Sequence, residues 1–439
     1  MKDHAVCTAA GATLAVIAAV LLSGAVAARA QQAPPAVKLG IVSFLTGPAA
    51  SPFGIPGRNA AEVLIEAFNA GKAPAPYDKV GLGGARIDVK YLDEAGSTAN
   101  QVTEFRNLVQ RDGVDAVVGY VSSGNCLAVT PVAEELKTLT VLYDCGTPRI
   151  FEEAPRKYVF RVTPNATIDS VGAARYVVHA IKNISVFSGL NQNYAWGQDS
   201  WRDFVAAMKV LAPKATVDKE LFPKLFVGEY GAEISALSTS GSQLIHSSFY
   251  DGDLEAFVFQ ASARGLFQRI PVVFTTGEAA LLRLGAKMPD GTLIGARGLN
   301  GMLAKDTPFN RWFQQVYTTR YGVPPTYPSY HMAQSLMGLK VAWEKSGAGK
   351  GAEKPTTEQV GAAFEGLQFE GPATTLRLGL GKGHQGISGI AYGTYHFNKQ
   401  DAKPEIVDVI NYSAECVNPP EGTTAQVWLE GGMQGAKCD

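Results

Sequence analysis

The stretch DAVVGYVSSGNCLAVTPVAEELKTLTVLYDCGT, residues 115–147, decides the fold. Asp115 to Val121 is an apolar run of strand length, Leu127 to Leu136 has the length of a helix, and Thr138 to Tyr143 is a second β-like run. A strand, a helix and another strand in succession predict two parallel strands joined by a crossover helix. Parallel strands are covered by helices on both faces, so this segment predicts an α/β protein.

The same alternation continues on both sides of this segment. Upstream, a strand expected at Val37 to Leu45 is followed by a helix from Arg58 to Ala70. A second strand, Arg86 to Leu92, is followed by a helix that Ser97 caps. Downstream, a second series with the same rhythm begins after Pro164. Its expected helices are Ile168–Ile181, Asp199–Leu211, Ala232–Ser238 and Leu254–Gly265, and its strands are Ile184–Ser188, Ala215–Phe222, Gln243–Phe249 and Pro271–Phe274.

Because the alternation of strands and helices begins again after Pro164, the sequence predicts two doubly wound, Rossmann-like lobes rather than one large sheet. The remaining chain offers helices at Pro328–Lys345 and Thr357–Gly366 and a β-like segment at Ile387–Asn398, which would complete both sheets. The hinge is therefore crossed more than once. The expected limits are 36–162 with about 279–378 for the first lobe, 163–278 with about 379–415 for the second, and 416–439 for a C-terminal tail.

Residues 1–30 have the features of a cleaved signal peptide. The run from Ala9 to Ala27 is almost wholly Ala, Val, Leu, Ile and Gly, and Ala28-Arg29-Ala30 forms an A-x-A cleavage pattern before Gln31. A transmembrane anchor is disfavoured because the apolar run is short and ends in small residues. Cys7 precedes the run, so no lipid-anchor cysteine follows it. The mature chain is expected in the periplasm.

Composition narrows the function classes. Lys and Arg number 39 against 40 Asp and Glu, and such a balance does not indicate nucleic acid or an anionic membrane surface as a partner. Roughly four hundred residues follow the signal peptide, enough for two domains with their own cores.

Four cysteines remain after the signal peptide, an even number in an oxidising compartment. Proximity along the chain favours the pairs Cys126–Cys145 and Cys416–Cys438. Each bond closes a loop of roughly twenty residues, which stabilises by about 3 kcal/mol through loop entropy. The alternative is a single reactive cysteine, which is disfavoured because an exported thiol beside other thiols oxidises.

No catalytic or cofactor motif is found. The turn Thr46 to Ser51 after the first strand matches neither a dinucleotide loop nor a Walker loop, and H-E-x-x-H and G-x-S-x-G are missing. Histidines are scattered, so no metal site is predicted. A binding protein without catalytic residues or cofactor is expected. The alternative is an exported hydrolase that uses Ser123 or Cys145 as its nucleophile.

Polar and aromatic residues follow four of the predicted strands. In open α/β sheets, small ligands bind at the carboxyl ends of the strands, against loops and helix N-termini. These candidate cleft residues are Ser122 and Ser123, Cys145 and Thr147, Tyr194 and Trp196, and Tyr250, Asp251 and Asp253. Hydroxyl groups and free N–H groups at a helix start suit a carboxylate.

The chain resembles the periplasmic branched-chain amino acid binding proteins, the type I receptors of ABC transporters, over nearly the whole mature chain. The order and spacing of several segments carry the resemblance: Val37–Val42 with Thr46-Gly47-Pro48, Gly119–Ser123, Cys145–Pro148, Phe160–Pro164, Trp196-Gly197, Gly265–Phe267 with Pro271–Val273, and Tyr327–Tyr330.

The resemblance implies a role for each cleft residue. Ser123, the backbone of Cys145 and Thr147 would hold a carboxylate, and Asp253 would neutralise an ammonium group. Trp196 would cover the ligand and Phe53 would line its side-chain pocket, with Glu278 also assigned to the cleft. A tryptophan where tyrosine is common, a cysteine where a small residue is usual, and the extra acid Asp251 are departures from the family pattern.

The implied activity is capture of a small amino acid by closure of the two lobes, without turnover, and delivery to membrane permease subunits by a monomer. Relatives also bind amides and aromatic carboxylates, so an aromatic carboxylate or an amide is the alternative ligand. The aromatic residues Tyr194, Trp196, Tyr250 and Tyr330 suit a flat ring.

Overall fold

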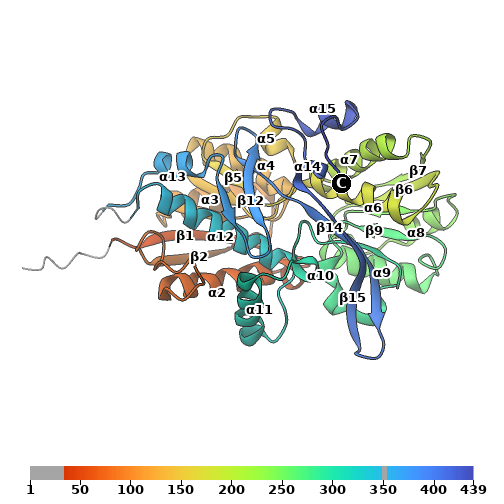
Figure 1. Ribbon diagram of the computed structural model, residues 1–439, viewed down its shortest axis with the longest axis horizontal. Coiled ribbons are helices and arrows are strands. Elements are labelled where there is room, and N and C mark those ends of the chain that lie inside the picture. Colours follow the sequence, from red (N-terminus) through yellow and green to blue (C-terminus); the bar gives the residue numbers. More distant parts are fainter. Residues whose placement is uncertain (1–33, 349–352, 439) are drawn as a thin grey trace, which may run out of the picture. The chain divides into compact units, whose positions relative to one another are not determined.

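The computed structural model describes residues 34–348 and 353–438. The predicted signal peptide, residues 1–30, lies outside these ranges. Within them, the chain forms two sheets with helices on both faces of each (Figure 1). No helix in the described part of the chain is both long enough and apolar enough to cross a membrane.

Eight strands of the described chain form the first sheet, in the order β11-β12-β13-β5-β4-β3-β1-β2. Their bounds are β1 Val37–Ser43, β2 Ile87–Asp93, β3 Ala116–Gly119, β4 Leu139–Leu142, β5 Val159–Arg161, β11 Gln368–Glu370, β12 Thr375–Leu380 and β13 Gln385–Ile387. Strands β1 to β5 pair in parallel, whereas β12 runs antiparallel to both β11 and β13. The sheet is doubly wound, because the order reverses at β1.

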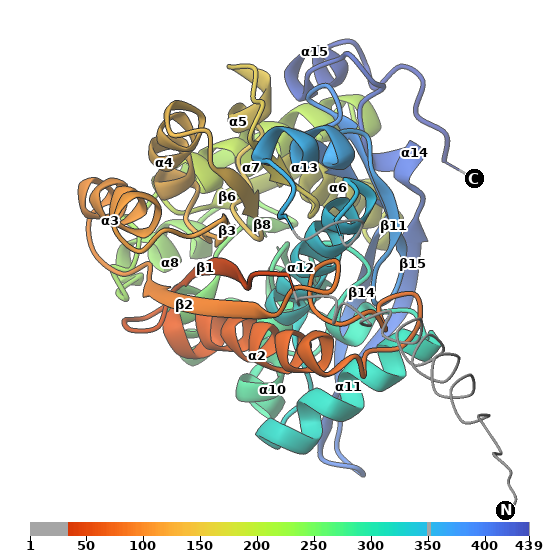
Figure 2. The ribbon, with the colours of Figure 1, turned by 90° about the vertical axis from the view of Figure 1, so that its left-hand side faces the viewer.

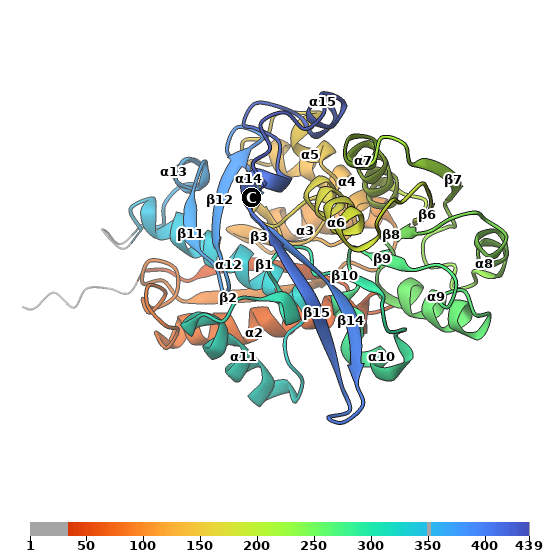
Figure 3. The ribbon, with the colours of Figure 1, turned by 45° about the vertical axis from the view of Figure 1, so that its right-hand side comes forward.

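The second sheet has seven strands within the described ranges, in the order β15-β14-β10-β9-β8-β6-β7. Their bounds are β6 Val186–Leu190, β7 Thr216–Leu221, β8 Ile245–Ser247, β9 Val272–Phe274, β10 Leu293–Gly295, β14 Ile390–Asn398 and β15 Lys403–Tyr412. Strands β6 to β10 are parallel, and β14 and β15 form a long antiparallel hairpin at one edge (Figure 3).

The connecting helices are α2 Ile55–Ala70, α3 Thr98–Gln110, α4 Ser123–Glu135, α5 Arg149–Glu152, α6 Ala166–Ala180, α7 Ala195–Leu211, α8 Gly231–Ser238, α9 Asp251–Ala263, α10 Glu278–Leu284, α11 Pro308–Tyr321, α12 Tyr327–Lys345, α13 Thr357–Phe364, α14 Ala414–Val417 and α15 Ala425–Glu430. Short turns η1 Ala50–Gly54, η2 Gly285–Lys287 and η3 Gly301–Leu303 complete the set. Ser97 caps α3 as predicted, because its side chain accepts a hydrogen bond from the backbone N–H of Asn100.

Each sheet buries apolar side chains on both faces. In β1, Leu39 and Ile41 join a cluster with α2 and α12, whereas Val42 points to the other face, with α3 and α4. Figure 2 shows α2 and α3 on opposite sides of β1 and β2. Successive strand residues alternate between faces, so a strand that is apolar throughout requires two covering layers. The predicted fold class, two doubly wound α/β lobes, is confirmed.

Several elements escaped prediction. The three-residue strands β5 and β10 are too short to show a period, and the helix α11 and strand β15 carry many polar residues. Strand β10 lies in the second sheet although 279–378 was assigned to the first lobe, and β12 and β13 lie in the first sheet at and beyond its expected end. The lobe limits themselves remain a prediction, because helices and loops also define a lobe.

The C-terminal tail is held by the predicted disulfide between Cys416 and Cys438, with 4.7 Å between the Cα atoms. Trp428 and Leu429 of α15 pack into the cluster that includes α7, and the two helices lie side by side (Figure 1). The backbone N–H of Ala425 donates to Glu152 Oε1 of α5 at 2.8 Å. The tail therefore contacts elements that flank both sheets.

His246 of β8 makes the stability of the protein sensitive to acid. Its side chain has no exposed surface, and its ring stacks on Phe204 with 4.2 Å between ring centroids. Burial lowers the pKa of this imidazole from 6.5 to about 3. Below pH 6.5 the unfolded chain takes up a proton that the folded chain does not. This group therefore lowers the free energy of unfolding by about 1.4 kcal/mol for each pH unit between those two values.

His246→Phe should remove this acid dependence while keeping an aromatic ring against Phe204. Urea unfolding at several pH values between 7 and 4 should show the wild type losing stability faster than the variant on acidification. His179→Phe, at an exposed position, is the control and should follow the wild type. Parallel pH profiles for wild type and His246→Phe would contradict the assignment.

Candidate functional site

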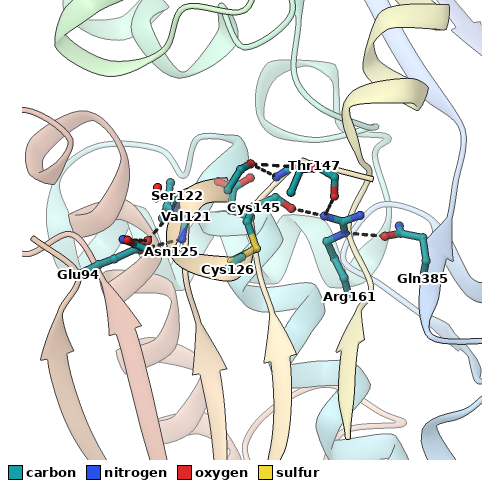
Figure 4. The surroundings of a disulfide bond; sticks show 12 residues. Glu94, Val121, Ser122, Asn125, Cys126, Cys145, Thr147, Arg161 and Gln385 are labelled. Atoms are coloured by element: carbon teal, nitrogen blue, oxygen red, sulfur yellow. Dashed lines mark hydrogen bonds between the residues drawn. A yellow bond between two sulfur atoms is a disulfide. The ribbon is translucent and has the colours of Figure 1, made fainter. Parts of the chain in front are cut away.

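The segments that follow β3 and β4 of the first sheet, called the loop pair below, are cross-linked by a disulfide. Strands β3 and β4 are parallel neighbours, so the segments that follow them meet at the same sheet edge. A disulfide joins Cys126 of α4 to Cys145, which follows β4, with 6.5 Å between the Cα atoms (Figure 4). Arg161 lies beneath, donating from Nη1 to the carbonyl oxygens of Cys145 at 2.5 Å and Thr147 at 2.9 Å. The predicted Cys126–Cys145 disulfide is therefore present, and Arg161 adds hydrogen bonds to the loop after β4.

The hydroxyl groups nominated for a carboxylate make internal hydrogen bonds. Ser123 Oγ accepts from the backbone N–H groups of Gly146 and Thr147, both at 3.2 Å. Thr147 Oγ1 donates to Asp199 Oδ2 of α7 at 2.6 Å, which links the first-sheet loop to the helix after β6. Of these two hydroxyl groups, only that of Ser123 donates to no acceptor within residues 34–348 and 353–438.

The start of α4 already holds a carboxylate from the chain itself. Glu94, after β2, accepts from the backbone N–H groups of Val121 at 2.7 Å and Ser122 at 2.8 Å and from Asn125 Nδ2 at 3.1 Å (Figure 4). Burial raises the pKa of Glu94 to about 8, and these N–H groups act in the opposite direction. Sequence reasoning missed Glu94. The available signal was an acidic residue directly after a strand end.

The acidic residues assigned to the second lobe have different surroundings. Asp253 is buried, and its Oδ2 accepts from Gln192 Nε2 and from the backbone N–H of Phe226, both at 2.9 Å. Glu278 accepts from the backbone N–H groups of Met302 at 3.0 Å and Tyr327 at 2.8 Å, and burial raises its pKa to about 7. The side chain of Asp251 lies outside the described residues.

One cavity collects the loops that follow strands of both sheets. It is lined by Phe53, Val121, Asp144, Gly146, Tyr194, Trp196, Tyr250, Thr276, Arg297 and Tyr327. Four of the predicted cleft residues are among them: Phe53, Tyr194, Trp196 and Tyr250. The structure adds Asp144, Arg297 and Tyr327, whereas Ser122, Ser123, Cys145, Thr147, Asp253 and Glu278 are not part of the lining.

Half of the residues that line the cavity are aromatic. The ring of Phe53 contacts those of Tyr250 and Tyr327 edge to face, at centroid distances of 5.8 and 5.3 Å, and the hydroxyl groups of Tyr194 and Tyr250 are 2.7 Å apart. Trp196 Nε1 donates to the carbonyl oxygen of Ser248 at 2.9 Å, which fixes the indole plane. Such rings accept flat apolar groups on their faces and cations over their π-systems.

Arg297, after β10, is the charged centre of the cavity. Its guanidinium lies 4.5 Å from the ring centroid of Trp196, pairs with Asp144, and donates from Nε to Asp169 Oδ2 at 3.0 Å. His331 of α12 contacts Asp144 Oδ1 through Nδ1 at 2.8 Å. Asp144 follows β4 of the first sheet and Asp169 belongs to α6, beside the second sheet, so Arg297 connects segments next to both sheets. Sequence reasoning missed Arg297 because it is a single arginine in a stretch without a motif.

The cavity is nearly filled by its own side chains. The remaining space is about 10 Å³, room for no more than one water molecule. The tightest contact is at Gly146, where an added Cβ would overlap the ring of Trp196 and lie 2.9 Å from the guanidinium of Arg297. In this arrangement, Trp196 and Arg297 leave no room for a solute beside Gly146.

Two doubly wound sheets, with strand ends that meet over one aromatic, charged cavity, define a two-lobed solute-binding fold. The chain belongs to the periplasmic binding protein family, whose model matches residues 36–399. The resemblance drawn from the sequence is confirmed.

A curated relative is the Leu/Ile/Val-binding protein homolog 3 of Brucella melitensis, 25% identical over 219 residues, which are 49% of this chain and 55% of that protein. The match thus spans about half of the relative. Two solved structures are similar. A solute binding protein of an ABC transporter from R. palustris, in complex with benzoate, has a TM-score of 0.71 at 18% identity, covering 85% of this chain and 96% of that one.

The second is the branched-chain amino acid transporter substrate binding protein LivJ of Streptococcus pneumoniae, in complex with isoleucine. It has a TM-score of 0.71 at 16% identity and covers 86% of this chain and 99% of that one. At these identities, the likeness to both structures shows the fold alone. Family and neighbours are substrate-binding proteins of ABC transporters rather than enzymes.

Proposed function

We propose that this protein is the periplasmic solute-binding component of an ABC importer and that it captures a small amino acid with an apolar side chain. The observation that carries the proposal is the cavity lining, where one carboxylate, Asp144, and one guanidinium, Arg297, share an aromatic enclosure. An α-amino acid carries one charge of each sign beside an apolar group, so this lining complements it.

In this proposal, Phe53, Tyr194, Trp196 and Tyr250 contact the apolar part of the solute. Arg297 receives the carboxylate, because a guanidinium is a donor of matching geometry, and the hydroxyl group of Ser123 is a further donor nearby in the loop pair. The solute touches loops of both sheets, so it binds the closed arrangement of the lobes more tightly than the open one and favours closure. A monomer then delivers it to membrane permease subunits.

An aromatic carboxylate is the second candidate ligand. It needs a cation and ring-shaped walls, both of which the cavity has, and a neighbouring structure of the same fold was solved with benzoate. An amino acid is preferred because an acid without an amine leaves the carboxylate of Asp144 without a partner from the solute.

Turnover is not part of the proposal. Cys145 is held in a disulfide, so it has no thiol to act as a nucleophile. The hydrolase alternative therefore rests on Ser123. Release of product from amides or esters at a catalytic rate, lost in Ser123→Ala, would overturn the binding proposal.

A thermal-shift panel tests the ligand class. The purified mature chain should be stabilised by L-leucine or L-phenylalanine, by about 2.7 kcal/mol when the ligand is at 100 times its dissociation constant. Gly146→Ala should abolish this shift, since the added methyl group occupies the space between Trp196 and Arg297. Gly124→Ala in the same loop pair should retain it, because its Cβ would meet only Ser122 Oγ, at 3.7 Å. A shift with benzoate and none with any amino acid would favour the second candidate.

A further inference from the structure

Asp253 was nominated for the solute's ammonium group, yet its surroundings are those of a structural residue. Its Oδ2 accepts hydrogen bonds from Gln192 Nε2 and from the backbone N–H of Phe226, both at 2.9 Å. It is not among the residues that line the cavity. Both donors belong to loops of the second sheet, so the carboxylate of Asp253 ties two neighbouring loops of one lobe together.

Asp144 has the opposite character. It lines the cavity and its side chain is fully buried, and its Oδ1 accepts from Arg297 Nη1 and faces His331 Nδ1 at 2.8 Å. Its Oδ2 has no hydrogen-bond partner within residues 34–348 and 353–438. A carboxylate accepts several hydrogen bonds, and a buried acceptor without a donor is costly. One oxygen of Asp144 is thus free to accept a donor from a solute.

The contacts of His331 and Arg297 fall on Oδ1 of Asp144 and leave Oδ2 as the acceptor. His331 Nε2 faces the carbonyl oxygen of Arg297 at 2.8 Å, and Nδ1 faces Asp144 Oδ1. The carbonyl oxygen can only accept, so Nε2 donates to it, and Nδ1 lies against Oδ1. Oδ1 is therefore engaged by His331 and Arg297, and a new donor can be received by Oδ2.

The positive charge of Arg297 does not serve Asp144 only. Its guanidinium is shared between Asp144 and Asp169, and Asp169 Oδ1 also has no partner among the described residues. Asp169 lies on α6 and is not part of the cavity lining. Of these two carboxylates, only Asp144 is placed to meet a solute. The surrounding aromatic rings, Trp196 among them, add attraction for a cation.

We infer that Asp144, rather than Asp253, receives the ammonium group of the solute through Oδ2. This inference rests on the proposed function, binding of an amino acid. It makes Asp144 the residue that separates amino acids from acids of the same shape without an amine, because the deamino acid has no donor for its free oxygen.

Titration calorimetry with two matched probe pairs tests the inference. The pairs are L-leucine with 4-methylpentanoate and L-phenylalanine with 3-phenylpropanoate, which differ only in the amine. The wild type should bind the amino acid of the preferred pair about 100-fold or more tightly than its deamino partner. Asp144→Asn should remove most of this preference by weakening the amino acid and leaving the deamino acid unchanged or stronger. Asp253→Asn, the matched control, should keep the preference.

The outcomes separate the two proposals. If Asp253→Asn loses the preference and Asp144→Asn keeps it, the inference is overturned and the proposed function stands. If the wild type binds neither amino acid but binds benzoate, the proposed ligand class fails and the inference fails with it. If Asp144→Asn does not fold, a crystal structure of the wild type with the preferred amino acid decides. An ammonium nitrogen within about 3.2 Å of Asp144 Oδ2 supports the inference, and one placed on Asp253 overturns it.

Discussion

Replacing Arg297 with methionine should lower the free energy of unfolding by about 3–5 kcal/mol. The guanidinium is 3% exposed and pairs with two fully buried carboxylates, Asp144 and Asp169. Methionine keeps much of the apolar stem but leaves both carboxylates buried without their cation. Urea unfolding followed by circular dichroism measures the loss.

Arg320→Met is the control for this prediction. Arg320 also bridges two carboxylates, Glu62 and Glu66, but its side chain is 42% exposed, and exposed ion pairs stabilise by at most about 1 kcal/mol. The two variants should therefore differ by several kcal/mol. Equal losses would mean that water reaches Arg297 and that the network is not buried as described.

Removal of the Cys126–Cys145 disulfide should cost about 3 kcal/mol by loop entropy alone, and more from lost packing. The bond spans 19 residues, and neither cysteine has exposed surface. The double variant Cys126→Ala/Cys145→Ala removes it without leaving a lone thiol. Because Arg161 donates to the carbonyl oxygen of Cys145, the loop after β4 should also become more mobile, which hydrogen exchange would detect.

The tail bond is the comparison for this second prediction. Cys416–Cys438 spans 22 residues, a loop of nearly the same entropy, but Cys438 lies at the surface. Cys416→Ala/Cys438→Ala should therefore cost less than the first double variant and leave exchange after β4 unchanged. The reverse order of the two denaturant midpoints would be inconsistent with this account.

The loops of the site were identifiable from the sequence because strand ends are a local feature. Phe53, Tyr194, Trp196 and Tyr250 each follow a predicted strand, and the carboxyl ends of parallel strands converge, so their meeting in one cavity was expected. The disulfide pairing could also be predicted, since the two cysteines of each pair are close along the chain. The first prediction depends on the position of each residue after a strand, and the second on closeness along the chain.

The partners of the charged groups could not be predicted in this way. Glu94 meets Ser122 over 28 positions of sequence, and Arg297 meets Asp144 over 153 positions, which include the passage of the chain from the first sheet to the second. No periodicity or motif marks such a pair, because its energy comes from burial that only the folded chain creates. In the folded chain, Asp253 accepts a hydrogen bond from Gln192 of a neighbouring loop. Oδ2 of Asp144, in contrast, has no hydrogen-bond partner among the described residues.

The sequence alone therefore predicts two doubly wound lobes, the sheet edge at which the cavity lies and the aromatic character of that cavity, because the periods of strands and helices depend on neighbouring residues. Only the tertiary structure decided which acid and which base line the cleft. Charges are placed there by packing between distant segments, where desolvation makes each partner indispensable.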